Sequence, residues 1–157
     1  MDDLELKEYL TQRILSFCDR WNVIENNIRT QHDAEEDTLK REFPEQEYHY
    51  AKRTDWFAIL SERISPLFDE FCTEKRRVYG GKVRKSFGYP SKFNGCGEPL
   101  EVHVELKIKS RAEIYIKTNT SFDDEYLFVA LKKSGDWLID SYKKRRYGNE
   151  KWDLQIL

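Results

Sequence analysis

Apolar residues recur at spacings of three and four positions along the first part of the chain. Between Leu4 and Arg29 they form one stripe, which consists of Leu6, Leu10, Ile14, Phe17, Trp21, Ile24 and Ile28. This period predicts an amphipathic helix whose stripe packs against a sheet or another helix. The charged residues of the segment, Glu25 among them, fall mostly off the stripe.

An acidic stretch separates this helix from a second helical pattern. Residues 33–47 carry seven acids and two bases, and we expect a short helix there that ends at Pro44. A new stripe runs from about Glu47 to Lys75, through Trp56, Leu60, Ile64, Leu67, Phe68 and Phe71. Because Pro66 removes one helical hydrogen bond, a kink or restart is expected near Ser65.

The second half of the chain alternates between apolar and polar residues, which indicates β-strands. Residues 100–109 predict a half-buried strand and residues 112–118 a second one. In the third strand, 126–131, both faces are apolar, so we expect it at the centre of the sheet and covered on both sides. Lys133-Ser134-Gly135-Asp136 then forms the turn of a β-hairpin with strand 137–142.

Helices followed by an antiparallel meander predict an α+β fold, in which N-terminal helices pack in a curved, mainly antiparallel sheet. The length of 157 residues fits a single domain, residues 1–157. Aromatic residues make up 14% of the chain, which indicates a packed core even though 36% of the residues are charged.

Charge and hydropathy argue against several classes of partner. A net charge of −2 does not favour nucleic acid or an anionic membrane. No apolar run approaches the roughly 18 residues of a membrane span. The N-terminal sequence MDDLELKEYL is acidic and amphipathic, unlike a secretory signal. These features predict a cytoplasmic protein.

No arrangement of residues predicts a metal site or a cofactor. Cys18 and Cys72 lie in helical patterns and Cys96 in a glycine-rich loop, which indicates two core residues and one loop thiol. Gly80-Gly81-Lys82 lacks the spacing of a phosphate-binding loop, so we interpret it as a helix C-cap followed by a turn.

Titratable residues offer few candidates for catalysis, and we assign no catalytic residue. The three histidines have polar or charged neighbours and are expected at the surface: His32, His49 and His103. Asp55 and Asp140 are the acids expected closest to the interior, where an apolar pocket raises the proton affinity of a carboxylate. Structural roles are the simpler interpretation of both.

Two basic runs, 75–92 and 143–146, are interleaved with aromatic residues, a composition that also suits RNA binding. The acidic stretch 33–47 and the acids 123–125 oppose them, so that the surface carries both signs of charge. Such a surface favours electrostatic steering toward one protein partner.

Several stretches in the second half of the chain carry a family pattern. They are FCTEKR (71–76) with YGG (79–81), SFGYPSKF (86–93), LFVALKK (127–133), GDWLIDSY (135–142) and KW (151–152). In these stretches the chain resembles the polymorphic-toxin immunity proteins of nuclear transport factor 2-like fold. The resemblance implies the cone-shaped sheet of that superfamily and a bacterial cytoplasmic protein that is not an enzyme and needs no cofactor.

The resemblance also implies a partner, a cognate toxin domain that the protein binds and neutralises by occluding its active site. Such toxins are commonly delivered in bacterial competition by contact-dependent, Rhs-type or type VI secretion systems. Nucleases, ADP-ribosyltransferases, deaminases and proteases all remain open as the toxin activity.

Acidic residues are our predicted contact surface for this toxin. Toxins that act on nucleic acids or nucleotides usually have basic clefts, so an acidic inhibitor would imitate the charge of the substrate. The predicted contact residues are Glu35, Glu36, Asp37, Asp123, Asp124 and Glu125. A solvated helix face and a loop tip are the alternative interpretation of these acids.

Two other functions remain open from the sequence. One is a small cone-fold enzyme of the isomerase or dehydratase type, built on Asp55 or Asp140. The other is a non-catalytic binding scaffold, including a homodimer that pairs through the outer faces of the two sheets.

Overall fold

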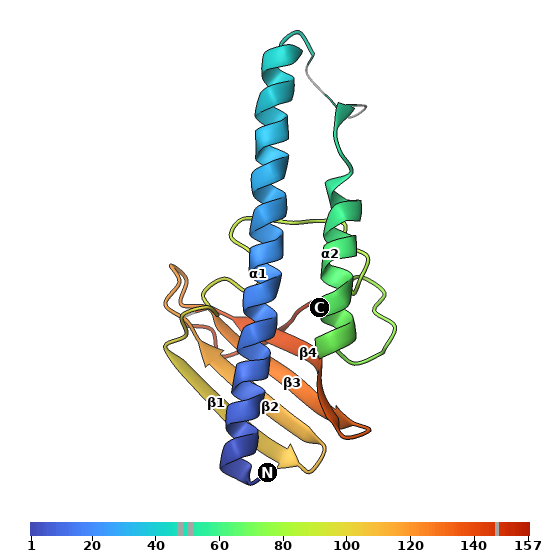
Figure 1. Ribbon diagram of the computed structural model, residues 1–157. Helices are drawn as coiled ribbons and strands as arrows, with labels where there is room; N and C mark the ends of the chain where they lie inside the picture. The colour runs from blue at the N-terminus through green and yellow to red at the C-terminus, as the bar shows by residue number, and fades with distance from the viewer. Residues whose placement is uncertain (47–48, 50–51, 147) are drawn as a thin grey trace.

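Two α-helices and a five-stranded sheet form the described part of the protein, which in the computed structural model comprises residues 1–46, 49, 52–146 and 148–157. The elements are α1 (Asp3–Glu42), α2 (Trp56–Phe71), β1 (Glu101–Ile108), β2 (Arg111–Lys117), β3 (Glu125–Lys133), β4 (Asp136–Arg145) and β5 (Asp153–Leu154). The strands lie in this order in the sheet, and all neighbours are antiparallel. α1 runs across one face of the sheet, with α2 alongside it (Figure 1). This is the α+β architecture predicted from the sequence.

α1 is a single helix of 40 residues, considerably longer than the predicted segment Leu4–Arg29. The acidic stretch does not form a separate short helix, because its Glu, Ala, Lys and Arg residues have high helix propensity and continue the first one. Burial of Leu39 shows that the apolar stripe extends into this stretch. The helix ends at Glu42, two residues before Pro44. This is expected because the residue that precedes a proline disfavours the helical conformation.

α2 is shorter than the predicted pattern 47–75, and Pro66 does not divide it. Residues 52–55 and 72–75 lie outside the α-helix, whereas residues 47, 48, 50 and 51 are not among the described residues. Pro66 is exposed, so water can replace the helical donor that the Glu62 carbonyl loses. The predicted restart near Ser65 was therefore wrong, and the alternative of a kink stays a prediction.

β3 lies at the centre of the sheet, between β2 and β4, as predicted. Tyr126, Phe128 and Ala130 are fully buried on one of its faces. On the opposite face Val129 is buried, at 5% exposure, but Leu127 and Leu131 are only half-buried, because neither helix of the described part crosses that side of the sheet (Figure 1). The expectation of cover on both sides is therefore met only at Val129. The two-residue strand β5 was missed because it is too short to show a period.

An aromatic core fills the space between α1 and the sheet, and a loop residue lies at its centre. Phe93 has no exposed surface and belongs to the loop before β1. Its ring lies within 5.2 to 6.4 Å of five other rings, which are those of Phe17, Trp21, Tyr126, Phe128 and Tyr142. Aromatic pairs at such distances contribute about 0.5–1.5 kcal/mol each beyond the apolar area they bury.

Two polar residues of α1 hold the loop that carries Phe93. The Asn22 side chain accepts a hydrogen bond from the Phe93 N–H (3.1 Å) and donates one to the Phe93 carbonyl (2.8 Å). One turn further along, the Glu25 carboxylate accepts hydrogen bonds from the N–H groups of Gly88 (3.0 Å) and Lys92 (2.8 Å). Glu25 is therefore buried, at 6% exposure, although the sequence pattern placed it off the apolar stripe.

Three other expectations need correction. His49 is buried, and its Nε2 lies 3.1 Å from the Phe43 carbonyl oxygen. Cys96 belongs to a loop as predicted, but its thiol is fully buried. Gly80-Gly81 does not cap a helix, since α2 already ends at Phe71. Instead, the Gly81 N–H donates to the carbonyl of Leu157 at 2.8 Å.

Candidate functional site

The three predicted contact acids of α1 differ in their surroundings. The Glu35 carboxylate accepts hydrogen bonds from the N–H (2.8 Å) and hydroxyl of Thr54 and from the indole of Trp56 (3.3 Å). The hydroxyl of Thr54 is the main cause of the lowered pKa of Glu35. Glu36 forms an ion pair with Arg53. Asp37 is exposed and has no polar partner among the described residues. Two of these acids thus tie the chain before α2 to α1.

The other three predicted acids lie at the start of β3, and two of them have internal partners. Glu125 forms an ion pair with Arg145 and accepts a hydrogen bond from the Tyr115 hydroxyl at 2.7 Å. Although burial raises the pKa of Glu125, the hydrogen bond from Arg145 lowers it overall. Asp124 is buried, at 5% exposure, and Asp123 is half-buried with a φ of 48°.

The six acids do not form one continuous belt. Residues 35–37 lie on the part of α1 that extends beyond the sheet, whereas residues 123–125 lie at the beginning of the central strand β3 (Figure 1). A toxin contact at either place stays a prediction. Asp37 and Asp123 are the two of these acids whose carboxylates form neither an ion pair nor a hydrogen bond among the described residues.

The two acids considered for catalysis have structural partners. Asp55 is exposed and caps α2 by accepting a hydrogen bond from the Ala58 N–H at 3.1 Å. Asp140 accepts hydrogen bonds from the Thr73 hydroxyl (2.9 Å) and the Lys75 ammonium (3.0 Å). Burial raises the pKa of Asp140, but these two donors lower it overall, which is unlike a carboxyl prepared to donate a proton.

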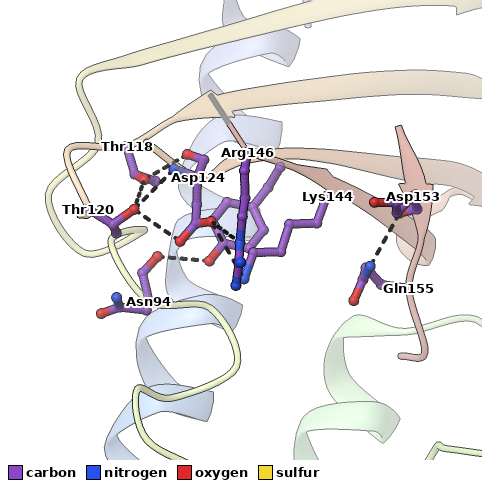
Figure 2. A network of polar contacts seen from close by, with 9 residues as sticks. Asn94, Thr118, Thr120, Asp124, Lys144, Arg146, Asp153 and Gln155 are labelled. Atoms are coloured by element: carbon purple, nitrogen blue, oxygen red, sulfur yellow. Dashed lines mark hydrogen bonds and ion pairs between the residues drawn. The ribbon is translucent and has the colours of Figure 1, made fainter. Parts of the chain in front are cut away.

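A pocket of about 570 Å³ lies between loop residues 89–94, loop residues 120–124 and the end of β4. Figure 2 shows Asp124, Lys144 and Arg146 pointing toward one another at this place. Asp124 Oδ2 accepts a hydrogen bond from the Thr120 hydroxyl at 3.0 Å. Its buried Oδ1 has no hydrogen bond within the described part, while Lys144 Nζ and Arg146 Nε each lie 3.9 Å away.

Lys92 adds a third cation to the lining of this pocket. Its ammonium donates to the Ile156 carbonyl and lies 5.4 Å from the centre of the Tyr142 ring. Burial, followed by repulsion from Arg84, lowers the pKa of Lys92 to about 8, and Lys144 adds a further repulsion. The pocket therefore collects more positive charge than its one buried carboxylate balances.

A larger pocket, of about 700 Å³, lies along the basic stretch that follows α2. Several of its cations already have partners within the fold. Lys75 pairs with Asp140 and Lys82 with Asp69, while Arg77 donates to the Thr73 carbonyl at 2.8 Å. Several basic residues between 75 and 82 thus hold this loop to α2 and β4, and their charges are partly neutralised by these contacts.

The alternation of residues along β4 could have predicted part of the smaller pocket from the sequence. Lys144 follows Tyr142 by two positions, so both project from the same face of β4. The approach of Lys92 and Asp124 to this place depends on loops that periodicity does not describe. The run 143–146 was noted only as a basic stretch.

The described residues contain no group of three or more His, Cys, Asp and Glu side chains that could hold a metal ion. Among the helices of this part, none combines the length and the apolar character needed to cross a bilayer.

Comparisons with known proteins agree with this architecture. The chain is 22% identical over 91 residues to "Immunity protein RhsIA" of Dickeya dadantii (strain 3937), and this region makes up 58% of the present chain. It spans 65% of that relative, or just under two thirds of its length. No solved structure matches the chain.

A family match covers most of the chain. The family described as NTF2 fold immunity protein matches residues 41–155. This range begins before the stretches that carried the resemblance and includes α2, all five strands and, apart from Asn26, the lining of both pockets. The chain therefore belongs to the NTF2 fold immunity protein family, and its two helices and antiparallel sheet are an α+β fold of the NTF2-like type.

Proposed function

We propose that this immunity protein binds one cognate bacterial toxin domain and neutralises it by covering the active site of the toxin. The observation that carries the proposal is the family match over residues 41–155. A relative named as an Rhs immunity protein supports it. The protein acts here as a binding partner and not as an enzyme, and residues 1–157 act as one domain.

Inhibition by occlusion makes two physical demands. The surface must keep its shape before binding, because ordering it on contact would subtract from the affinity. The complex must also dissociate slowly, since a released toxin molecule resumes its activity. The aromatic core around Phe93, the hydrogen bonds of Asn22 with Phe93 and those that Glu25 accepts from the loop meet the first demand, because they hold the loop against α1.

Isothermal titration calorimetry with the toxin domain encoded next to this protein tests the proposal. We expect a 1:1 complex with a dissociation constant of about 1 nM or lower, near −12 kcal/mol, and loss of toxin activity. A basic protein of unrelated fold is the control for charge attraction alone. Failure to bind, or binding that leaves the toxin active, would refute the proposal. Sedimentation of the free protein decides whether it is also a homodimer.

The predicted acidic contacts can be tested without disturbing the fold. Asp37→Asn and Asp123→Asn remove charge from side chains without an internal ion pair among the described residues, and asparagine tolerates the positive φ at position 123. If these acids contact a basic toxin cleft, the double variant binds more weakly and with a smaller salt dependence. Unchanged affinity and salt dependence would remove both residues from the contact surface.

The toxin's delivery by an Rhs-type or type VI system, and a cytoplasmic place of action for the immunity protein, are parts of the same proposal. A toxin made in the producing cell's cytoplasm has to be blocked there. Fractionation of a producing strain, with the toxin followed in wild-type and secretion-deficient cells, tests both points.

A further inference from the structure

We propose that the pocket lined by Lys92, Asp124, Lys144 and Arg146 receives an acidic side chain of the toxin. This pocket is called the cationic pocket below. The inference rests on the proposed function and adds to it the chemistry of one contact. It also assigns Asp124 a role opposite to the one predicted from the sequence, since Asp124 would partly offset the charge of the cations and would not itself contact a basic cleft.

The charges in the cationic pocket do not balance. Three cations and one carboxylate line the pocket, and two of the cations, Lys144 and Arg146, share the carboxylate Oδ1 at 3.9 Å each. A strong N–H···O⁻ hydrogen bond is about 2.7–2.9 Å long, so Asp124 does not fully satisfy either of these two cations. An incoming carboxylate would supply the missing acceptors. Its two oxygens can each accept more than one hydrogen bond.

The pocket is built before the partner arrives. Asp124 is fixed through its backbone, where the N–H donates a hydrogen bond to the Thr120 hydroxyl oxygen at 3.0 Å and the carbonyl accepts one from the Thr118 hydroxyl at 2.7 Å. Lys144 lies 5.4 Å from the centre of the Tyr126 ring and Arg146 4.3 Å from that of Phe122. Side chains held in this way lose little conformational entropy on binding.

The rim of the pocket suits a protein and not a small anion. Tyr89 and Phe122 line the pocket and are 76% and 58% exposed. Arg29 lies over the Tyr89 ring at 4.2 Å. Exposed aromatic residues beside arginine are the composition enriched in protein interfaces and their binding hot spots. A free carboxylate or phosphate would leave both rings in water.

Substitution of Asp124 shows whether the toxin group that enters the pocket is acidic or basic. Asp124→Asn keeps the shape of the side chain but raises the charge of the pocket by one. If an acidic toxin residue enters, Asp124→Asn tightens binding, by about threefold or more for one added charge. If Asp124 itself contacts a basic toxin group, the same variant weakens binding.

Arg146→Glu is the complementary change, with Lys143→Glu as its matched control. Arg146 is 58% exposed in its side chain, so the variant is expected to fold. Lys143 is exposed on the opposite face of β4 and makes the same charge change away from the pocket. We expect Arg146→Glu to weaken binding of the adjacently encoded toxin by about tenfold or more, and Lys143→Glu to change it little.

The outcomes separate the inference from the function on which it rests. If the wild type neither binds nor neutralises the toxin, the proposed function fails and this inference with it. If the wild type binds but Arg146→Glu and Lys143→Glu bind equally well, or if Asp124→Asn weakens binding, only the inference fails. Restoration of the Arg146→Glu complex by an Asp→Lys or Glu→Lys change in the toxin would confirm it. Thermal stabilisation of the wild type by millimolar citrate, absent in Arg146→Glu, together with unimpaired toxin binding by that variant, would assign the pocket to a small anion instead.

Discussion

Asn22 forms two hydrogen bonds with the backbone of Phe93, one to its N–H and one to its carbonyl, although 71 positions separate the two residues. An amide side chain can do this because it carries a donor and an acceptor side by side. The pair holds the loop backbone against α1 while the Phe93 ring enters the core. Position 93 is therefore specified twice, by polar contacts and by aromatic packing.

Asn22→Ala should destabilise the protein by about 2 kcal/mol, because two hydrogen bonds are lost at roughly 1 kcal/mol each. Chemical denaturation measures the change. Asn27→Ala is the matched control, since Asn27 is exposed on the same helix, and its effect should stay within about 0.5 kcal/mol. Equal effects of the two substitutions would show that the hydrogen bonds to Phe93 contribute nothing to stability.

Two buried tyrosines should respond differently to loss of their hydroxyl groups. The Tyr126 hydroxyl donates to the Asn94 carbonyl at 2.8 Å, whereas that of Tyr142 has no hydrogen-bond partner within the described residues. Tyr126→Phe should cost about 1 kcal/mol or more, because a partly buried carbonyl also loses its donor. Tyr142→Phe should be close to neutral. Calorimetric melting of both variants tests the difference, and a reversed order would contradict it.

Stability should fall in alkaline solution. Burial raises the pKa of Cys72 and Tyr115 to about 12 and raises those of Tyr126 and Tyr142 further. The folded protein therefore keeps these protons above their ordinary pKa values of about 8.5 for cysteine and 10 for tyrosine, while the unfolded chain loses them. Since the folded state then binds more protons, the free energy of unfolding decreases as pH rises.

Lys92 acts in the opposite direction over part of this range. Burial lowers its pKa to about 8, so between that value and about 10.4, the ordinary pKa of lysine, the unfolded chain binds the extra proton. Lys92→Met should therefore steepen the alkaline loss, and Tyr142→Phe should reduce it above about pH 10. Urea titrations with a reducing agent measure both slopes. Parallel curves for wild type and variants would be inconsistent with these pKa shifts.

Gly80 should be intolerant of any side chain. A Cβ atom there would lie 2.2 Å from the Leu157 carbonyl oxygen and 2.6 Å from Ile156 Cγ2. Gly80→Ala is expected to cost about 1–3 kcal/mol, as in other overpacked sites. Gly97→Ala is the control, because a Cβ atom there meets nothing within 4 Å. A melting temperature lowered equally in both variants would show that the contact with the chain end is not tight.

The parts of the fold that periodicity describes were predicted well from the sequence. The first four strands and the buried stripes of both helices follow from residue spacing, because each needs only one apolar face. Contacts that depend on tertiary structure were missed. Burial of Glu25 is an example, since its three N–H donors come from Trp21 on its own helix and from residues 88 and 92 of a distant loop.

The candidate site shows the same division. Asp124 was identified as an acid at the end of a loop, but its burial beside Lys144 and Arg146 could not be deduced from a local pattern. As a result, the partner group inferred at Asp124 changes from a basic one to an acidic one. Local charge predicts an acidic surface, and the surroundings of Asp124 produce a cationic pocket.

α1 precedes in sequence every other element of the described part, and this order has a consequence for synthesis. Its aromatic rings pack against those of Phe68, Phe71 and Phe93, and Arg13 donates to the Trp137 carbonyl at 2.7 Å across 124 positions. A ribosome makes α1 before the strands, and Trp137 follows Arg13 only after 124 positions. The nascent helix must therefore keep a long apolar surface uncovered until the strands have been made. This is the interval in which chaperones or premature association would compete with folding.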